Sequence, residues 1–325
     1  MSAVAAELRH QRFVAAVPEI ERIEAQPLLA EIEQLKRARH AVVLAHNYQA
    51  PAIYHGVADF TGDSLALAQQ AAHSAADVIV VAGVQFMAET AKLLNPARMV
   101  LIPSNRAGCS LAESITVQDV RTLRRQHPGV PVVSYVNTSA AVKAESDICC
   151  TSANALRVVE SLGVPKVIFL PDRFLGHHVQ QQIGVELVLW EGACEVHERF
   201  TGAQLRGLRR DHPGLEIVAH PECPPEVLAE ADFVGSTQGM VDHLAHSKPA
   251  QVALITECSM SDNVAVEFPG IRFVRPCNLC PHMRQITLAG IRDALRELRH
   301  EVTLAAEIIA PARRSLERML AVGRG

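Results

Sequence analysis

The sequence predicts an α/β fold in which one small domain with a parallel sheet is used three times around a common axis. Three cysteines indicate the repeat, because 85 residues separate Cys109 from Cys194 and 86 separate Cys194 from Cys280. Each of them follows a short, strand-like apolar run, and such runs alternate with Ala- and Leu-rich helical segments. This alternation is typical of parallel sheets with helical crossovers.

A second feature of the sequence, a pair of similar segments, recurs at the same interval as the cysteines. The segment 116–138, TVQDVRTLRRQHPGVPVVSYVNT, aligns without a gap with 201–223, TGAQLRGLRRDHPGLEIVAHPEC, at an offset of 85 residues. Both contain LRR and an HPG turn. A fixed period over this length indicates duplicated units, and a period near 85 is that of whole small domains.

The composition excludes several classes of function. The chain has 325 residues, 49% of them hydrophobic, and a formal net charge of −4. Because Lys and Arg are not clustered, we expect no nucleic-acid partner and no membrane partner. The N-terminus lacks the apolar core of a signal peptide. Eight cysteines without a secretory signal favour a cytoplasmic protein, in which metal or redox chemistry is more common than a disulfide framework.

The elements of the first repeat are predicted from periodicity. Residues 1–38 are predicted to be helical because apolar residues recur there at three- and four-residue spacings between charges. Strands are then predicted at 41–45, 78–82 and 99–103, with helices at 62–74 and 87–94. In the later repeats, the strands before the second and third cysteines are predicted at 185–190 and 271–274.

The chain is predicted to become helical again from about residue 281. Ile291, Leu295, Leu298 and Val302 form a helical stripe, and Pro311 is expected to open a last short helix. We therefore expect four regions, which are the first repeat with an N-terminal helix (1–115), the second repeat (116–200), the third repeat (201–288), and C-terminal helices packing on the first repeat (289–325).

Polar residues stand at the end of one strand in each repeat. The aligned strand ends are His46-Asn47-Tyr48, Tyr135-Val136-Asn137 and His220-Pro221-Glu222. In open parallel sheets, ligands bind beyond the carboxyl ends of the strands. Side chains at i and i+2 of an extended backbone point the same way, so each polar pair can face one cavity.

A further recurring pair lies where helices are predicted to begin. Asp63-Ser64, Thr151-Ser152 and Ser236-Thr237 are candidate helix N-caps, and local capping alone explains each pair taken singly. If the three helix N-termini converge, their N–H groups and dipoles form a receptor for carboxylate or phosphate. Such a receptor suits a small polyanionic substrate.

The three cysteines suggest a metal centre other than zinc. A structural zinc site needs four ligands, usually in closely spaced pairs, and the chain has one CxxC, from Cys277 to Cys280. Three thiolates on one axis suit a [4Fe–4S] cluster, which is normally held by four cysteines. The missing ligand would leave one iron open as a Lewis acid for a hydroxyl or carboxylate oxygen.

A series of longer motifs runs through the chain in the order AHNYQ (45–49), GDSL (62–65), GVQFMAETAK (83–92), YVNTSA (135–140), CTSAN (150–154), PDRFLG (171–176), WEGACEVH (190–197), AHPEC (219–223), GST (235–237) and CPHM (280–283). With these motifs, the sequence resembles the quinolinate synthase family from about residue 40 to 288. The resemblance implies three similar α/β domains about a pseudo-threefold axis with a [4Fe–4S] cluster between them.

The resemblance also implies one cluster ligand from each domain, namely Cys109, Cys194 and Cys280. Cys277 competes for the third place, but the repeat interval favours Cys280. Some family members have CxxCxxC here and a disulfide switch; because Val274 stands at the first of these positions, that switch is not expected. The remaining cysteines are expected to pack as small hydrophobic residues: Cys149, Cys150, Cys223 and Cys258.

The activity that the resemblance implies is condensation of iminoaspartate with dihydroxyacetone phosphate to quinolinate, with loss of phosphate and two waters. An aspartate oxidase or dehydrogenase is the expected supplier of iminoaspartate. The implied proton carriers are His46, Tyr48, His220 and Glu222. The implied substrate-binding residues are Asp63, Ser64, Tyr135, Asn137, Ser152, His197, Ser236 and Thr237.

Two other functions fit a three-cysteine cluster. An iron–sulfur hydro-lyase would remove water from a small hydroxy acid at the same open iron, but the three helix starts are better explained by a phosphate-bearing substrate. A cytosolic iron–sulfur sensor would need an output surface such as a basic recognition helix, and the sequence predicts none.

Overall fold

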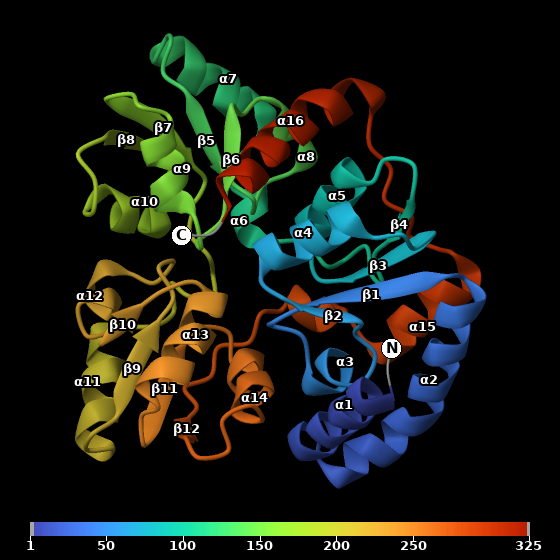
Figure 1. Ribbon diagram of the computed structural model, residues 1–325. Helices are drawn as coiled ribbons and strands as arrows, with labels where there is room; N and C mark the ends of the chain where they lie inside the picture. Colours follow the sequence, from blue (N-terminus) through green and yellow to red (C-terminus); the bar gives the residue numbers. More distant parts are fainter. Residues whose placement is uncertain (1–2, 324–325) are drawn as a thin grey trace.

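The computed structural model describes residues 3–323 and shows three parallel β-sheets surrounded by helices (Figure 1). Each sheet has four strands in the same order, in which the second strand of the unit lies at one edge and is followed by the first, third and fourth. This shared topology confirms the predicted fold class of three similar α/β units. The unit boundaries after residues 115, 200 and 288 stay predictions.

The strands are short and parallel to their neighbours. The first sheet has β1 (Ala41–His46), β2 (Phe60–Gly62), β3 (Val78–Ala82) and β4 (Met99–Leu101). The second has β5 (Val132–Tyr135), β6 (Ile148–Cys150), β7 (Lys166–Leu170) and β8 (Glu186–Leu189). The third has β9 (Glu216–Ala219), β10 (Phe233–Val234), β11 (Gln251–Ile255) and β12 (Arg272–Val274).

Helices connect the strands and cover the sheets. In the first unit they are α1 (Ala3–Ala16), α2 (Glu19–Ala38), α3 (Pro51–Tyr54), α4 (Ser64–His73), α5 (Gln85–Leu94) and α6 (Ser110–Glu113). In the second they are α7 (Val117–Gln126), α8 (Ala140–Ala144), α9 (Ala155–Ser161) and α10 (Arg173–Gln180). The third has α11 (Gly202–Asp211), α12 (Pro225–Leu228), α13 (Thr237–Ser247) and α14 (Ser259–Ala265). A 3₁₀ turn η1 (Met283–Gln285), α15 (Leu288–Glu297) and α16 (Ala306–Val322) follow.

The two aligned sequence segments form the same local structure. Thr116 and Thr201 cap α7 and α11, each in a reciprocal capping box with the residue three positions later. The two HPG turns then place Gly129 and Gly214 at the same positive φ of 79°, where glycine is favoured because it lacks a Cβ. In both units an arginine of the helix pairs at 2.8 Å with an aspartate before the second strand, Arg124 with Asp147 and Arg209 with Asp232. The duplication predicted from sequence is therefore structural.

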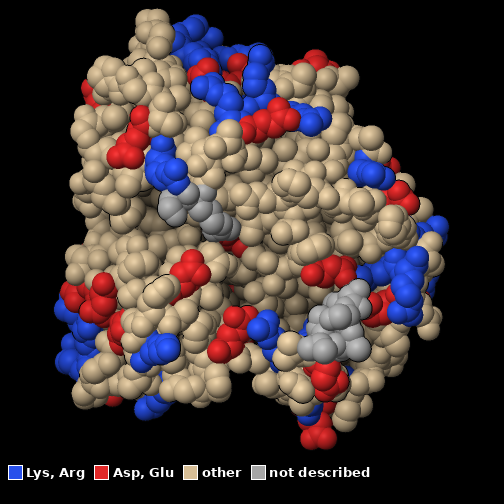
Figure 2. All heavy atoms as spheres, in the orientation of Figure 1, with Lys and Arg blue, Asp and Glu red and all other residues tan. Residues whose placement is uncertain are grey.

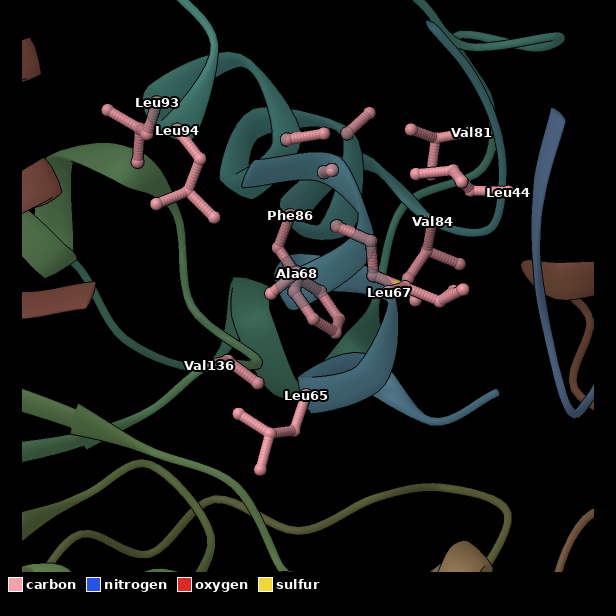
Figure 3. Packing of buried hydrophobic residues seen from close by; sticks show 14 of the residues in the cluster. Leu44, Leu65, Leu67, Ala68, Val81, Val84, Phe86, Leu93, Leu94 and Val136 are labelled. Carbon is pink, nitrogen blue, oxygen red and sulfur yellow. The ribbon is translucent and has the colours of Figure 1, made fainter. Parts of the chain in front are cut away.

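The hydrophobic core is continuous across the first two units and separate in the third. One cluster of buried side chains includes Ile79 of β3, Phe169 of β7 and Leu316 of α16. Figure 3 shows part of this cluster, where Phe86 of α5 and Val136 after β5 lie near the boundary of the two units. The third unit is filled by two clusters of its own, one on each side of β9 and β11. Strands buried on both faces are expected where helices cover a parallel sheet.

The C-terminal helices differ from the prediction. The helix α15 contacts α2 and β3 of the first unit, as expected, but α16 lies mainly against α8 and β6 of the second unit and also contacts α5. The predicted stripe ends early because Leu298 adopts a left-handed conformation that stops α15. Pro311 lies inside α16 rather than at its start.

The surface carries charges of both signs. On the face in Figure 2, Lys and Arg side chains lie among Asp and Glu side chains around the rim, and the middle of the face is mostly uncharged. Several charged side chains of the protein form ion pairs, for example Arg121 with Glu145 at 2.7 Å. Among residues 3–323, the structure contains no helix with the length and apolar character needed to cross a bilayer.

Candidate active site

One cavity brings together residues from all three units. The strand-end residues after β1, β5 and β9 line it, and so do the three recurring cysteines. The empty volume of the cavity, including the part open to solvent at its mouth, is about 740 Å³. The predicted site residues that line it are His46, Tyr48, Asp63, Ser64, Cys109, Tyr135, Asn137, Ser152, Cys194, His220, Glu222, Thr237 and Cys280. The other two predicted site residues, His197 and Ser236, are buried and do not line the cavity.

The three cysteines have the same local geometry. Each sulfur faces the backbone N–H groups two and three residues ahead, which are those of residues 111 and 112 for Cys109, 196 and 197 for Cys194, and 282 and 283 for Cys280. Desolvation by the surrounding protein raises the pKa of Cys109 to about 12, and it also raises the pKa of Cys194 and Cys280. The thiolates therefore need a bound cation to form, while the N–H groups are already oriented to stabilise them.

Beside Cys194 lies a buried cluster of acid–base groups. The Nδ1 atom of His197 lies 2.7 Å from Oε2 of Glu222, and Nδ1 of His220 lies 3.7 Å from the same oxygen. The rings of His197 and His220 stack with centroids 4.7 Å apart. Tyr135 contributes a hydrogen bond from its hydroxyl to Glu222. The cluster thus joins side chains of the second and third units around one carboxylate.

Burial and these neighbours shift the pKa values in the cluster. Burial opposes ionisation of Glu222, but His220, His197 and the Tyr135 hydroxyl outweigh it and lower the pKa of the carboxyl. Burial lowers the pKa of His220 to about 3 and that of His46 to about 4, so both rings are neutral at pH 7. Titratable groups with strongly shifted pKa values in a cavity are typical of active sites.

Tyr48 reaches this cluster from the first unit. Its hydroxyl lies 2.6 Å from Oγ1 of Thr256, and its ring packs edge-on against His46 with centroids 4.6 Å apart. Desolvation and the nearby charge of Glu222 raise the pKa of Tyr48 well above 10. The phenol is therefore protonated at neutral pH and available as an acid.

The predicted helix starts are confirmed at two of three places. Asp63 caps α4 by accepting a hydrogen bond from the N–H of Ala66, and Ser236 caps α13 by accepting one from Gly239. In the second unit α9 begins at residue 155, so Thr151 and Ser152 lie in the preceding turn and are not caps, which corrects the prediction. Nevertheless Thr151 and Ser152 line the cavity beside the starts of α4 and α13. The three segments converge, as an anion receptor requires.

Comparison with known sequences identifies the family. A sequence model described as quinolinate synthetase A protein matches residues 30–321. Quinolinate synthase 1 of Mesorhizobium japonicum is 65% identical over 291 residues, which are 90% of each chain. Quinolinate synthase of Agrobacterium fabrum is 60% identical over 313 residues, 96% of this chain and 91% of that protein. Quinolinate synthase of Xylella fastidiosa is 60% identical over 304 residues, 94% of this chain and 90% of that protein.

The chain belongs to the quinolinate synthetase A family. It is an enzyme of that type. Membership of the quinolinate synthetase A family implies an iron–sulfur cluster, and the residues present fit such a group. Three thiols from three units line one cavity, and each is surrounded by N–H donors of the kind that stabilise cluster sulfur ligands.

One cysteine assignment is wrong. Cys258, expected to pack as a free thiol, forms a disulfide with Cys277, and their Cα atoms are 4.9 Å apart. The bond joins the segment after β11 to the segment that carries Cys280. It also removes Cys277 from the competition for the third ligand position, which leaves Cys280 as the half-buried free thiol there. Cys149, Cys150 and Cys223 are buried free thiols, as predicted.

Three residues of the site were not predicted from the sequence. Thr256 contacts both Tyr48 and His197, and Asn263 binds the backbone on both sides of Tyr48. Glu257 is fully buried and accepts the N–H of Cys280 at 3.3 Å, and burial raises its pKa to about 7. A signal was present, because Thr256 and Glu257 directly follow the apolar run 252–255, and the strand-end rule used for β1, β5 and β9 applies equally to β11.

Proposed function

We propose that the protein is a quinolinate synthase that condenses iminoaspartate with dihydroxyacetone phosphate and releases phosphate and two waters, as a step of NAD biosynthesis. The observation that carries the proposal is the single cavity in which the three thiols, the Glu222 cluster and three anion-receptor segments meet. Each of the three units supplies one thiol and one strand-end pair to that cavity. This arrangement combines a site for a metal cluster with groups that bind anions and move protons.

The cofactor is proposed to be a [4Fe–4S] cluster held by Cys109, Cys194 and Cys280. When bound, such a cluster supplies one iron without a protein ligand, which acts as a Lewis acid toward a hydroxyl or carboxylate oxygen. The protein's own contribution is to orient the sulfurs through paired N–H groups and to limit access of water. The half-buried state of all three thiols keeps them open to the cavity.

Substrate anions are proposed to bind where the helix starts converge. Both substrates are anionic, with carboxylates on iminoaspartate and a phosphate on dihydroxyacetone phosphate. Backbone N–H groups at the starts of α4 and α13, with the hydroxyls of Ser64, Ser152 and Thr237, provide donors for them. Asn137 adds an amide whose Oδ1 atom has no hydrogen-bond partner within residues 3–323. It is a candidate acceptor for a substrate N–H.

Tyr48 and Glu222 are proposed to exchange protons with the three-carbon unit and its adducts. The protonated phenol of Tyr48 can donate, and the ionised Glu222 can accept, and both side chains line the cavity. His46 and His220, both neutral, complete the set of hydrogen-bonding groups around the reacting carbons. Iminoaspartate would come from an aspartate oxidase or dehydrogenase, in the cytoplasm.

An anaerobic assay tests the function. Reconstituted protein is given freshly formed iminoaspartate and dihydroxyacetone phosphate, and quinolinate and inorganic phosphate are measured together. We expect both products in equal amounts and no quinolinate when either substrate is omitted. Removal of water from small hydroxy acids, with no quinolinate from the two substrates, would instead identify an iron–sulfur hydro-lyase and overturn the proposal.

A further inference from the structure

Lys143 is a fully buried lysine to which the proposed function gives no role. It lies in α8, and its Nζ atom donates hydrogen bonds to the backbone carbonyl oxygens of Val136, at 2.7 Å, and of Thr138. Nζ also lies 5.5 Å from the centroid of the Phe86 ring. Within residues 3–323 Lys143 belongs to no ion pair, so these carbonyls and this ring replace the water that the ammonium group loses on burial.

The two carbonyls belong to the residues before and after Asn137. Asn137 lines the cavity, and its Oδ1 atom has no hydrogen-bond partner in the part of the chain that the structure describes. The main chain of Asn137 forms no hydrogen bond of its own within residues 3–323. The position of Asn137 therefore depends on its neighbours in the turn, and Lys143 holds one carbonyl on each side.

The first unit contains the same arrangement at the equivalent place. Nδ2 of the buried Asn263 donates to the carbonyl oxygens of Asn47, at 3.0 Å, and Gln49, at 2.8 Å, which flank Tyr48. Tyr48 and Asn137 are both the third residue of the aligned strand ends, and both line the cavity. In each of these two units, a buried side-chain donor thus holds the carbonyls on both sides of a strand-end residue.

We propose that Lys143 is a positioning residue that holds Asn137 in place to accept a hydrogen bond from the N–H of iminoaspartate. This inference rests on the proposed function, in which Asn137 is a candidate acceptor for a substrate N–H. Lys143 does not line the cavity, so it acts through Asn137. Without its ammonium group, the two carbonyls would be buried with no donor, and the turn would rearrange to satisfy them and displace Asn137.

Two single variants and their combination separate positioning from stability. Lys143→Met keeps most of the side-chain volume and removes the donors, and Asn137→Ala removes the amide. For each, we expect kcat/KM for iminoaspartate to fall roughly 30-fold. KM for dihydroxyacetone phosphate should change less than about threefold, because that substrate has no N–H to donate.

The double variant shows whether Lys143 acts through Asn137. Two residues that serve one contact with the substrate do not have independent effects. We therefore expect K143M combined with N137A to lie within about threefold of N137A alone, whereas independent effects would multiply to roughly 900-fold.

Lys36→Met is the matched control for the loss of a buried ammonium group. Lys36 is also buried, donates to the carbonyl of Val57 at 3.0 Å, pairs with Asp59 at 2.7 Å and does not line the cavity. Because K36M also leaves a carbonyl and a carboxylate without their donor, we expect it to lower Tm as K143M does. It should leave kcat/KM for iminoaspartate unchanged.

Crystal structures of the cluster-loaded protein and of K143M show the turn independently of turnover. In K143M we expect the carbonyls of Val136 and Thr138 to turn away from residue 143, and Asn137 to leave its place in the cavity wall. If K143M does not fold, Lys143→Gln is measured in the same way, because its uncharged amide is one bond shorter and does not reach the position of Nζ.

The outcomes distinguish this inference from the proposed function. If the unchanged protein makes no quinolinate, the proposed function fails, and the crystal structures still decide on Lys143. The inference is overturned if Asn137 keeps its place in K143M, if K143M retains full kcat/KM for iminoaspartate, or if the double variant shows the product of the two single effects. An equal rise in KM for both substrates, or a fall in kcat/KM for K36M as large as that for K143M, would overturn it as well.

Discussion

Tyr48 is the single side chain on which the proposed proton transfers depend most. Replacement by Phe removes the hydroxyl and keeps the ring against His46. We expect Tyr48→Phe to lose quinolinate formation by at least about 100-fold, a typical size for loss of a general acid, while the visible absorption of the cluster is unchanged. Turnover near the normal rate in Y48F would remove Tyr48 from the mechanism.

Tyr54→Phe is the matched control for that substitution. Tyr54 is in α3, six residues after Tyr48, and is not among the residues that line the cavity. The same loss of a phenolic oxygen there is expected to leave the rate unchanged. A loss of rate in both variants would point to a general effect on the α3 region rather than to proton transfer.

A second residue-scale prediction concerns His55 and acid. Burial lowers the pKa of His55 to about 4, with a smaller contribution from the charge of Arg12, whereas the unfolded chain has a His pKa near 6.5. Between these pH values the unfolded state binds a proton that the folded state excludes, so stability falls as the pH falls from about 6.5 to 4.

His55→Phe keeps an aromatic ring against Tyr54 and removes this titration. Urea unfolding at pH 7 and pH 4.5 should show a smaller loss of stability on acidification for the variant than for the unchanged protein. An identical loss in the two proteins would mean that His55 titrates normally when folded.

At the residue scale, the sequence predicted the cavity residues well because they repeat. His46, Tyr135 and His220 were found as equivalent positions in three units, and each lines the cavity. Thr256 was missed because it contacts the side chains of Tyr48 and His197, and Asn263 because it binds the backbone on both sides of Tyr48. Both sets of contacts join segments that are far apart in sequence. The disulfide between Cys258 and Cys277 was missed because the cysteine count without a secretory signal favoured free thiols.

Among the elements, the equivalent helices α7 and α11 allow a test of capping. Thr116→Ala and Thr201→Ala each remove a side chain that accepts a hydrogen bond at a helix start. Each substitution is expected to lower the free energy of unfolding by about 1 kcal/mol, and the two effects should add because the caps lie in different units. Urea unfolding measures both.

A third threonine provides the control for the caps. Thr122 lies inside α7 and bonds a carbonyl of its own helix. Because alanine has a higher helix propensity than threonine, Thr122→Ala should not destabilise the protein. A destabilisation by T122A as large as that by T116A would show that the loss is not due to capping.

Elements within a longer apolar run were predicted, including the short strands β4 and β12, whereas three of the shortest strands were not. Strand β3 lies at 78–82, as predicted. It could be predicted because its apolar run is five residues long. Strands β2, β6 and β10 have only two or three residues each, so no period can develop, and they exist because they pair with β1, β5 and β9. The end of α15 was missed because Leu298 continues the apolar stripe while its backbone turns left-handed.

For the whole molecule, the threefold arrangement explains why the site is built from distant segments. Each sheet has the same strand order, and ligands bind at the carboxyl ends of parallel strands, so three equivalent ends around an axis define one cavity. The first two units share a core with α16, whereas the third contributes Glu222 and Thr256 from a core of its own. The contact of α16 with the second unit was not foreseen, since its amphipathic pattern does not say which surface it covers.

The central claim is that each unit supplies one cysteine to a shared cluster, and the cluster content of cysteine variants tests it most directly. Protein purified without oxygen should contain about four iron and four sulfide per chain. Each of Cys109→Ala, Cys194→Ala and Cys280→Ala should lose this content, while Cys150→Ala, which removes a buried thiol away from the cavity, should keep it. A full [4Fe–4S] cluster retained in any one of the first three variants would contradict the claim.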